Sequence, residues 1–128
     1  MSYYLAKTLS TSFDDALTRT TEALKAEGFG VITQIDIRET LKRKVNADFR
    51  PYTILGACNP ALALEALKLE DKVGTMLPCN VIVQELKLGQ VEVAAVDPVA
   101  SMQAIENNDL TSKAQLVRSK LEKVVESL

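Results

Sequence analysis

Residues 81–96 read Val-Ile-Val-Gln-Glu-Leu-Lys-Leu-Gly-Gln-Val-Glu-Val-Ala-Ala-Val, and this stretch decides the fold. Two β-prone runs flank a turn at Leu88-Gly89-Gln90, which predicts a β-hairpin. A hairpin is an antiparallel pair, so the sheet that contains it cannot be purely parallel. We therefore expect a mixed or antiparallel sheet with helices packed on it.

Three further strands are expected before the hairpin, because short β-prone runs alternate there with helical patterns. These strands cover residues 3–9, 29–37 and 52–58. Two helices separate them. Ser12 caps the first, which ends at Gly28, and residues 39–45 form the second, which is short.

The strongest local signal is Asn59-Pro60, an N-cap residue followed by a proline at the first position of a helix that ends at Leu69. A polar link is expected at residues 70–75. After the hairpin we expect a short helix over residues 99–106.

The last helix is expected over residues 112–127, capped by Thr111 or Asp109. It could pack on this domain or on a second copy of the chain. Its apolar stripe consists of Ala114, Val117, Leu121, Val124 and Leu128.

Length and composition indicate one domain, residues 1–128, because no linker or repeat divides the 128-residue chain and a second core is unlikely at this length. The net charge of −2 argues against non-specific binding of nucleic acid. The chain has no histidine, which excludes Ser-His-Asp and Cys-His catalytic pairs within it and histidine-ligated metals. No cofactor is indicated.

The N-terminal sequence has no signal-peptide pattern, and no apolar run approaches the length of a membrane span. Two cysteines are too few for a disulfide-stapled secreted scaffold. We therefore expect a cytoplasmic protein with reduced thiols and no membrane partner.

The most charged stretch covers residues 38–50, where five basic residues against two acidic ones give a local charge of +3. A solvated connection is the favoured interpretation, and an anion-binding patch is the alternative.

Both cysteines stand in similar contexts, Cys58-Asn59-Pro60 and Pro78-Cys79-Asn80. A thiol just before a helix start meets free backbone N–H groups, which favour the reactive thiolate. Cys58 is therefore the better candidate for a reactive thiol, with Cys79 as its partner. The alternative is that both are buried apolar side chains.

The thiols meet only if the strands that flank them run antiparallel, which the sequence leaves open. A structural zinc site needs about four protein ligands, and two cysteines 20 residues apart do not supply them. The sequence therefore indicates no metal site within one chain, although a soft metal bound with carboxylates or across a dimer axis stays open.

Four blocks together resemble the family called domain of unknown function 302. They are Ile37-Arg38-Glu39-Thr40-Leu41, residues 51–60, residues 77–85, and Val96-Asp97-Pro98. The resemblance implies a compact α/β domain of bacterial or archaeal origin, with a curved, largely antiparallel sheet similar to TATA-binding-protein-like folds. With five predicted strands, the fold class is α+β with a mixed, mostly antiparallel five-stranded sheet.

The resemblance implies signature positions but carries no activity and no DNA binding. In this chain they are Gly56, Cys58, Asn59, Pro60, Pro78, Cys79 and Asn80.

The leading hypothesis is a small binding or redox domain whose site contains Cys58 and Cys79 and is shaped by the other signature residues. Its partner would be a small molecule, a soft metal or a disulfide. The alternative is a non-catalytic homodimeric interaction domain with structural cysteines. Whether the protein is an enzyme is left open. Carboxylates for an enzyme would come from Asp36, Glu39, Glu85 and Asp97.

Overall fold

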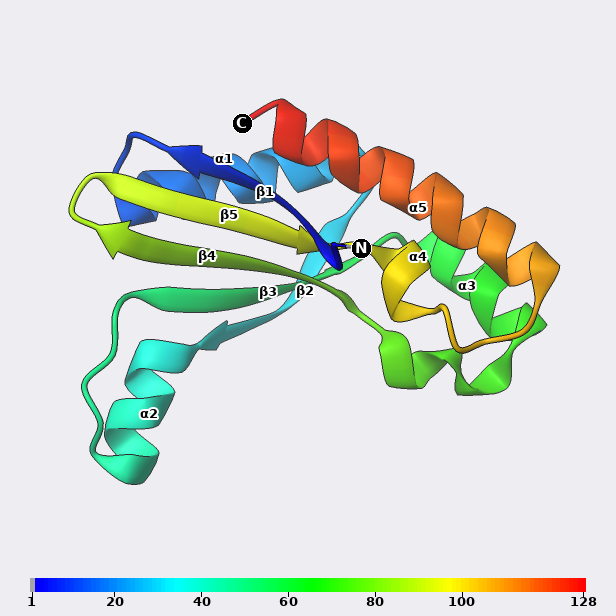
Figure 1. Cartoon of the computed structure of the whole chain (residues 1–128), viewed down its shortest axis with the longest axis horizontal. Coiled ribbons are helices and arrows are strands. Elements are labelled where there is room, and N and C mark those ends of the chain that lie inside the picture. The colour runs from blue at the N-terminus through cyan, green and yellow to red at the C-terminus, as the bar shows by residue number, and fades with distance from the viewer. Residues whose placement is uncertain (1) are drawn as a thin grey trace.

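A five-stranded antiparallel sheet forms the centre of the structure, a computed structural model that describes residues 2–128 (Figure 1). Every neighbouring pair of strands is antiparallel, and β4 and β5 form the hairpin that the sequence predicts. The expected fold class, a mostly antiparallel five-stranded sheet with helices packed on it, is confirmed. The strand order is β1 (Tyr4–Leu9), β5 (Gln90–Val96), β4 (Cys79–Lys87), β3 (Tyr52–Cys58) and β2 (Gly30–Asp36).

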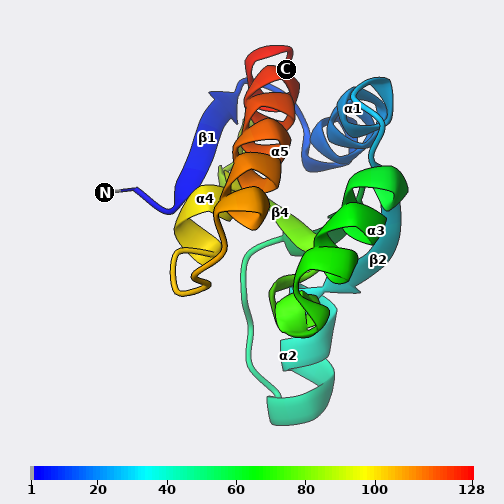
Figure 2. The same cartoon turned by 90° about the vertical axis from the view of Figure 1, so that its right-hand side faces the viewer.

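Helices α1 (Phe13–Ala26) and α5 (Asn108–Glu126) cover one face of this sheet (Figures 1 and 2). Alternate residues of the central strands point into this layer, as the period of two requires. Their side chains and those of the two helices form the main hydrophobic cluster. Its largest fully buried members are Leu24, Leu55, Leu121, Val81, Val83, Val91, Val93 and Val124.

A second, smaller cluster lies where α3 (Pro60–Leu69) and η1 (Asp71–Met76) meet the start of α5. Its buried residues are Ala66, Val73 and Leu110, one from each of these elements. Partly buried side chains from the segments around α4 (Pro98–Ser101) and before β4 pack against it. They are Leu77, Met102 and Ile105.

Helix α2 (Ile37–Val45) stands apart from the other helices and extends away from the end of β2 (Figure 1). Asp36 caps it by accepting a hydrogen bond from the Glu39 N–H at 2.9 Å, and none of its residues is buried. The charged stretch of the sequence therefore forms an exposed arm.

The three largest differences from the expected elements all lie around the second cluster. The polar link at 70–75 is a 3₁₀ helix, because Val73 turns inward and is fully buried. The helix expected at 99–106 ends at Ser101. The last helix starts four residues earlier than expected, because Asn107 is its cap and accepts from the Leu110 N–H at 3.1 Å.

No helix within residues 2–128 is long and apolar enough to cross a membrane.

Candidate functional site

A cavity of about 320 Å³ lies between the two hydrophobic clusters. Its walls come from the end of β3, from α3, from the segment that opens β4, from the start of α4 and from the first half of α5. The lining is almost entirely apolar. It consists of Phe29, Ile32, Ala57, Cys58, Asn59, Leu62, Ala63, Ala66, Leu67, Leu77, Pro78, Cys79, Pro98, Met102, Leu110, Lys113, Ala114 and Val117.

The antiparallel pairing of β3 and β4 brings the two cysteines to this cavity. Ala57 is the register partner of Cys79, so Cys58, the next residue, lies diagonally opposite Cys79 at the same edge of the sheet. Both thiols are free and both line the cavity, with Cys58 half-buried and Cys79 buried. The strand direction that the sequence left open therefore places the two cysteine blocks side by side.

Burial changes the acidity of one thiol. Desolvation, with a smaller contribution from the neighbouring Cys58, raises the pKa of Cys79 from 9.0 to about 11. At neutral pH Cys79 is therefore a neutral thiol, which is a poor nucleophile and a weak hydrogen-bond donor.

Asn59 connects the start of α3 to the cavity wall. Its Oδ1 accepts a hydrogen bond from the Leu62 N–H at 3.3 Å, and Pro60 occupies the first turn of the helix without lining the cavity. Gly28 has a φ of +85°, and a Cβ there would lie 3.0 Å from Asn59 Nδ2. The expected N-cap is confirmed, and a glycine at position 28 leaves room for the amide.

Gly56 allows the strands beside the cysteines to approach one another. A Cβ on Gly56 would lie 2.0 Å from Thr33 Oγ1 and 2.8 Å from Pro78 Cγ, so no larger residue fits without movement of its neighbours. The register pairs Gly56 with Asn80, which is exposed and lines a separate hollow with Tyr3, Tyr4 and Tyr52. Among the signature residues, Cys58, Asn59, Pro78 and Cys79 line the thiol cavity, whereas Gly56, Pro60 and Asn80 do not.

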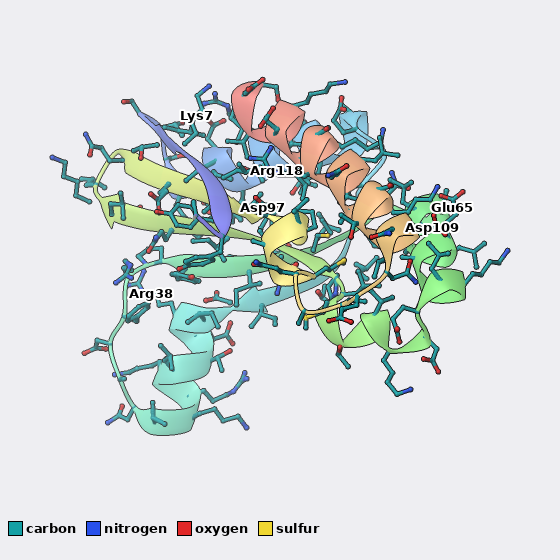
Figure 3. All side chains as sticks on the ribbon, turned by 45° about the vertical axis from the view of Figure 1, so that its right-hand side comes forward. Lys7, Arg38, Glu65, Asp97, Asp109 and Arg118 are labelled. Carbon is teal, nitrogen blue, oxygen red and sulfur yellow. The ribbon has the colours of Figure 1, made fainter. Side chains whose placement is uncertain are left out.

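None of the four carboxylates considered for an enzyme lines the cavity, and Asp36, Glu39 and Asp97 make interactions elsewhere. The buried Asp97 caps α4, and its Oδ2 accepts from Arg118 Nε at 3.0 Å (Figure 3). This pairing raises the pKa of Arg118 above its usual value. Asp36 caps α2, and Glu39 pairs with Arg43 at 3.5 Å.

Lys113 is a cavity residue that the sequence analysis missed. Among residues 2–128 it is the one charged side chain in the lining, and its Nζ lies 3.1 Å from Oε2 of Glu65 on α3. In the helix that the sequence predicts over residues 112–127, Lys113 is the second residue and has no apolar residue one turn before it. With the true start at 108, Lys113 stands three residues after Leu110, on the face that meets the cavity.

A metal centre is not assembled by these residues. Within the described chain, no three or more His, Cys, Asp or Glu side chains are grouped closely enough to hold a metal ion. The two thiols alone fall short of the four ligands of a structural zinc site.

Comparison with protein families finds a match between residues 5–128 and the family model described as Domain of unknown function DUF302. The chain is also similar to a solved structure, the crystal structure of an uncharacterized conserved protein DUF302 from Bacillus stearothermophilus. The two share 28% sequence identity over 98% of each chain, with a TM-score of 0.90. The comparison with curated proteins gave no match.

Proposed function

The chain belongs to the DUF302 family, and from the cavity beside its two cysteine blocks we propose that it binds a small, mostly apolar molecule. The observation that carries the proposal is the hollow between the two hydrophobic clusters. Its volume of about 320 Å³ is at the lower end of the range of ligand pockets, and its apolar wall carries a few polar groups, as such pockets do.

The two thiols supply polarizable walls and weak donors in this proposal. A soft metal would need ligands beyond the two sulfurs. A dithiol exchange reaction would have to work with Cys79, whose raised pKa keeps it protonated at neutral pH. Binding of an apolar molecule needs neither additional metal ligands nor a deprotonated Cys79. A reducing compartment such as the cytoplasm would keep both thiols free.

The test is a titration of the ¹⁵N-labelled protein with octan-1-ol, followed by ¹H–¹⁵N NMR. We expect saturable shifts confined to residues that line the cavity. Ala63→Phe places a large side chain in the cavity and should abolish these shifts. Ala61→Phe is the matched control, because Ala61 is an exposed residue of the same helix that does not line the cavity.

Shifts that are absent from the wild-type protein, or that persist unchanged in Ala63→Phe, would contradict the proposal. A thermal melt of each variant establishes that the fold is retained, so that loss of binding reports on the cavity.

Self-association is a second candidate function, favoured by the exposed arm. Helix α2 has no buried residue, and Val45 at its end is 66% exposed. The charge of +3 on residues 38–50, against −2 for the whole chain, leaves −5 on the rest, so the arm of one copy would be attracted to the body of another. The apolar stripe of α5 no longer supports this idea, because Leu121 and Val124 of that stripe are buried within the chain.

Sedimentation velocity tests this candidate. If the arm mediates a dimer, Lys42→Glu with Arg43→Glu shifts the protein toward monomer, whereas Lys25→Glu on α1 does not. A wild-type protein that sediments as a monomer at all concentrations excludes the dimer.

A further inference from the structure

Within residues 2–128, the cavity lining contains one charged side chain, that of Lys113. Lys113 lines the cavity from α5, and its side chain is 36% exposed, so its ammonium group lies between the apolar interior and solvent. Its partner Glu65 belongs to α3 (Figure 3), is 52% exposed and does not line the cavity. The ion pair therefore joins α3 and α5, two of the elements that form the cavity wall.

The Glu65 carboxylate is an ion-pair partner that another anion could replace at Lys113. Exposed pairs of this kind contribute little to stability, because water screens both charges. The interior offers no competing charge, since within residues 2–128 every other lining group is uncharged. Asp109 lies one turn before Lys113 on the same helix (Figure 3), is exposed and is not part of the lining.

From this arrangement we propose that the ligand is an amphiphile with an apolar body and an anionic head group the size of a carboxylate. The apolar body fills the cavity beside the thiols, and the head group takes the place of the Glu65 carboxylate at Lys113 Nζ. This inference rests on the proposed function, because it requires the cavity to hold an apolar body.

The experiment compares three eight-carbon probes that differ only in the head group. They are octanoate, octan-1-ol and octylammonium, each titrated at pH 7 and followed by ¹H–¹⁵N NMR. We expect octanoate to bind about three- to tenfold more tightly than octan-1-ol, and octylammonium to bind most weakly. The preference for octanoate should decrease between 0.05 and 0.5 M NaCl, because salt screens the ion pair.

Two variants test whether the preference arises at Lys113, and a third is their control. Lys113→Met keeps the length of the side chain without its charge, so octanoate should lose its advantage while octan-1-ol binds as before. Lys68→Met is the control, because Lys68 is an exposed lysine of α3 that does not line the cavity. Glu65→Gln removes the competing carboxylate and should tighten octanoate binding about two- to threefold.

The outcomes separate this inference from the proposed function. If octan-1-ol binds in the cavity but octanoate has no advantage, or if octylammonium binds best, the anionic head group is wrong and the apolar pocket stands. If neither octanoate nor octan-1-ol shifts the cavity residues, the proposed function fails. An octanoate preference that persists in Lys113→Met overturns the role of this lysine.

Discussion

The two hydrophobic clusters of this small protein differ in how fully they are packed. The main cluster lies between regular elements, the sheet and the helices α1 and α5, whose side chains alternate or recur with a fixed period. The second cluster joins a 3₁₀ helix, the irregular segment after α4 and parts of the two longer helices α3 and α5. Regular elements fill the space between them, whereas the irregular ones leave the cavity at the boundary.

The largest expected effect comes from the same substitution at the two ends of α5. Leu121 is fully buried in the main cluster, and Leu121→Ala should cost about 3–5 kcal/mol, because a closed cavity remains. Leu110, 2% exposed, borders the existing hollow, so Leu110→Ala should cost about 2–3 kcal/mol. Urea unfolding measures both values.

Equal losses in the free energy of unfolding at the two positions would contradict the difference in packing, because they would mean that the second cluster is packed as tightly as the first. Ser119→Ala, an exposed position of the same helix, controls for helix propensity.

The sequence predicts the main cluster better than the cavity for the same physical reason. The strand Tyr52–Cys58 has the expected bounds, and the hairpin fixes the antiparallel sheet. The elements around the cavity depend on tertiary packing. Val73, for example, is buried in a segment that looks like a polar link, and Asn107 caps a helix whose apolar stripe suggests a later start.

The candidate site was accessible from the sequence only in part. The two cysteine blocks are visible as motifs, and the structure places them side by side because β3 and β4 are antiparallel. Lys113 could not be found, because its place at the cavity depends on the true start of α5 and on the position of α3.

The second effect concerns Cys79, which belongs to the main cluster and also lines the cavity. Its folded-state pKa of about 11 exceeds the 9.0 of an ordinary cysteine, so between these values the folded protein binds more protons than the unfolded chain. The free energy of unfolding therefore falls as pH rises from 9 to 11, by about 2–3 kcal/mol, and this contribution is fully present below pH 9.

Denaturant unfolding at pH 8, 9, 10 and 11 measures this effect as the difference between the wild-type protein and Cys79→Ala. The variant should lose less stability over this range. Parallel losses would mean that water in the cavity solvates the thiol, so that the hollow region extends into the main cluster.

A third effect tests the helix that closes one side of the cavity. Asp97 Oδ1 accepts from the Val99 N–H at 2.9 Å, while its Oδ2 holds Arg118. Asp97→Ala removes both interactions and should cost about 1–2 kcal/mol and weaken octan-1-ol binding, because Pro98 of α4 lines the cavity. Asp97→Ser keeps the cap and should recover about half of the loss.

Thermal melts and the octan-1-ol titration measure this third effect. Glu122→Gln removes the other, exposed partner of Arg118 at 3.1 Å and should change stability by less than about 0.5 kcal/mol. If Asp97→Ala loses stability but binds octan-1-ol as well as the wild-type protein does, the position of α4 does not affect binding in the cavity.

The smallest expected effect is a gain in stability at Thr20, on the face of α1 that contributes Ala16 and Leu24 to the main cluster. Thr20 is fully buried on α1, and its Oγ1 finds no hydrogen-bond partner among residues 2–128. Burial of an unpaired hydroxyl is unfavourable, so Thr20→Val, which keeps the shape of the side chain, should stabilise the protein by about 1 kcal/mol. Thr18→Val, at an exposed position of the same helix, should leave stability nearly unchanged. If Thr20→Val destabilises instead, the hydroxyl is satisfied by a water molecule, and the main cluster then contains a hydrated site of its own.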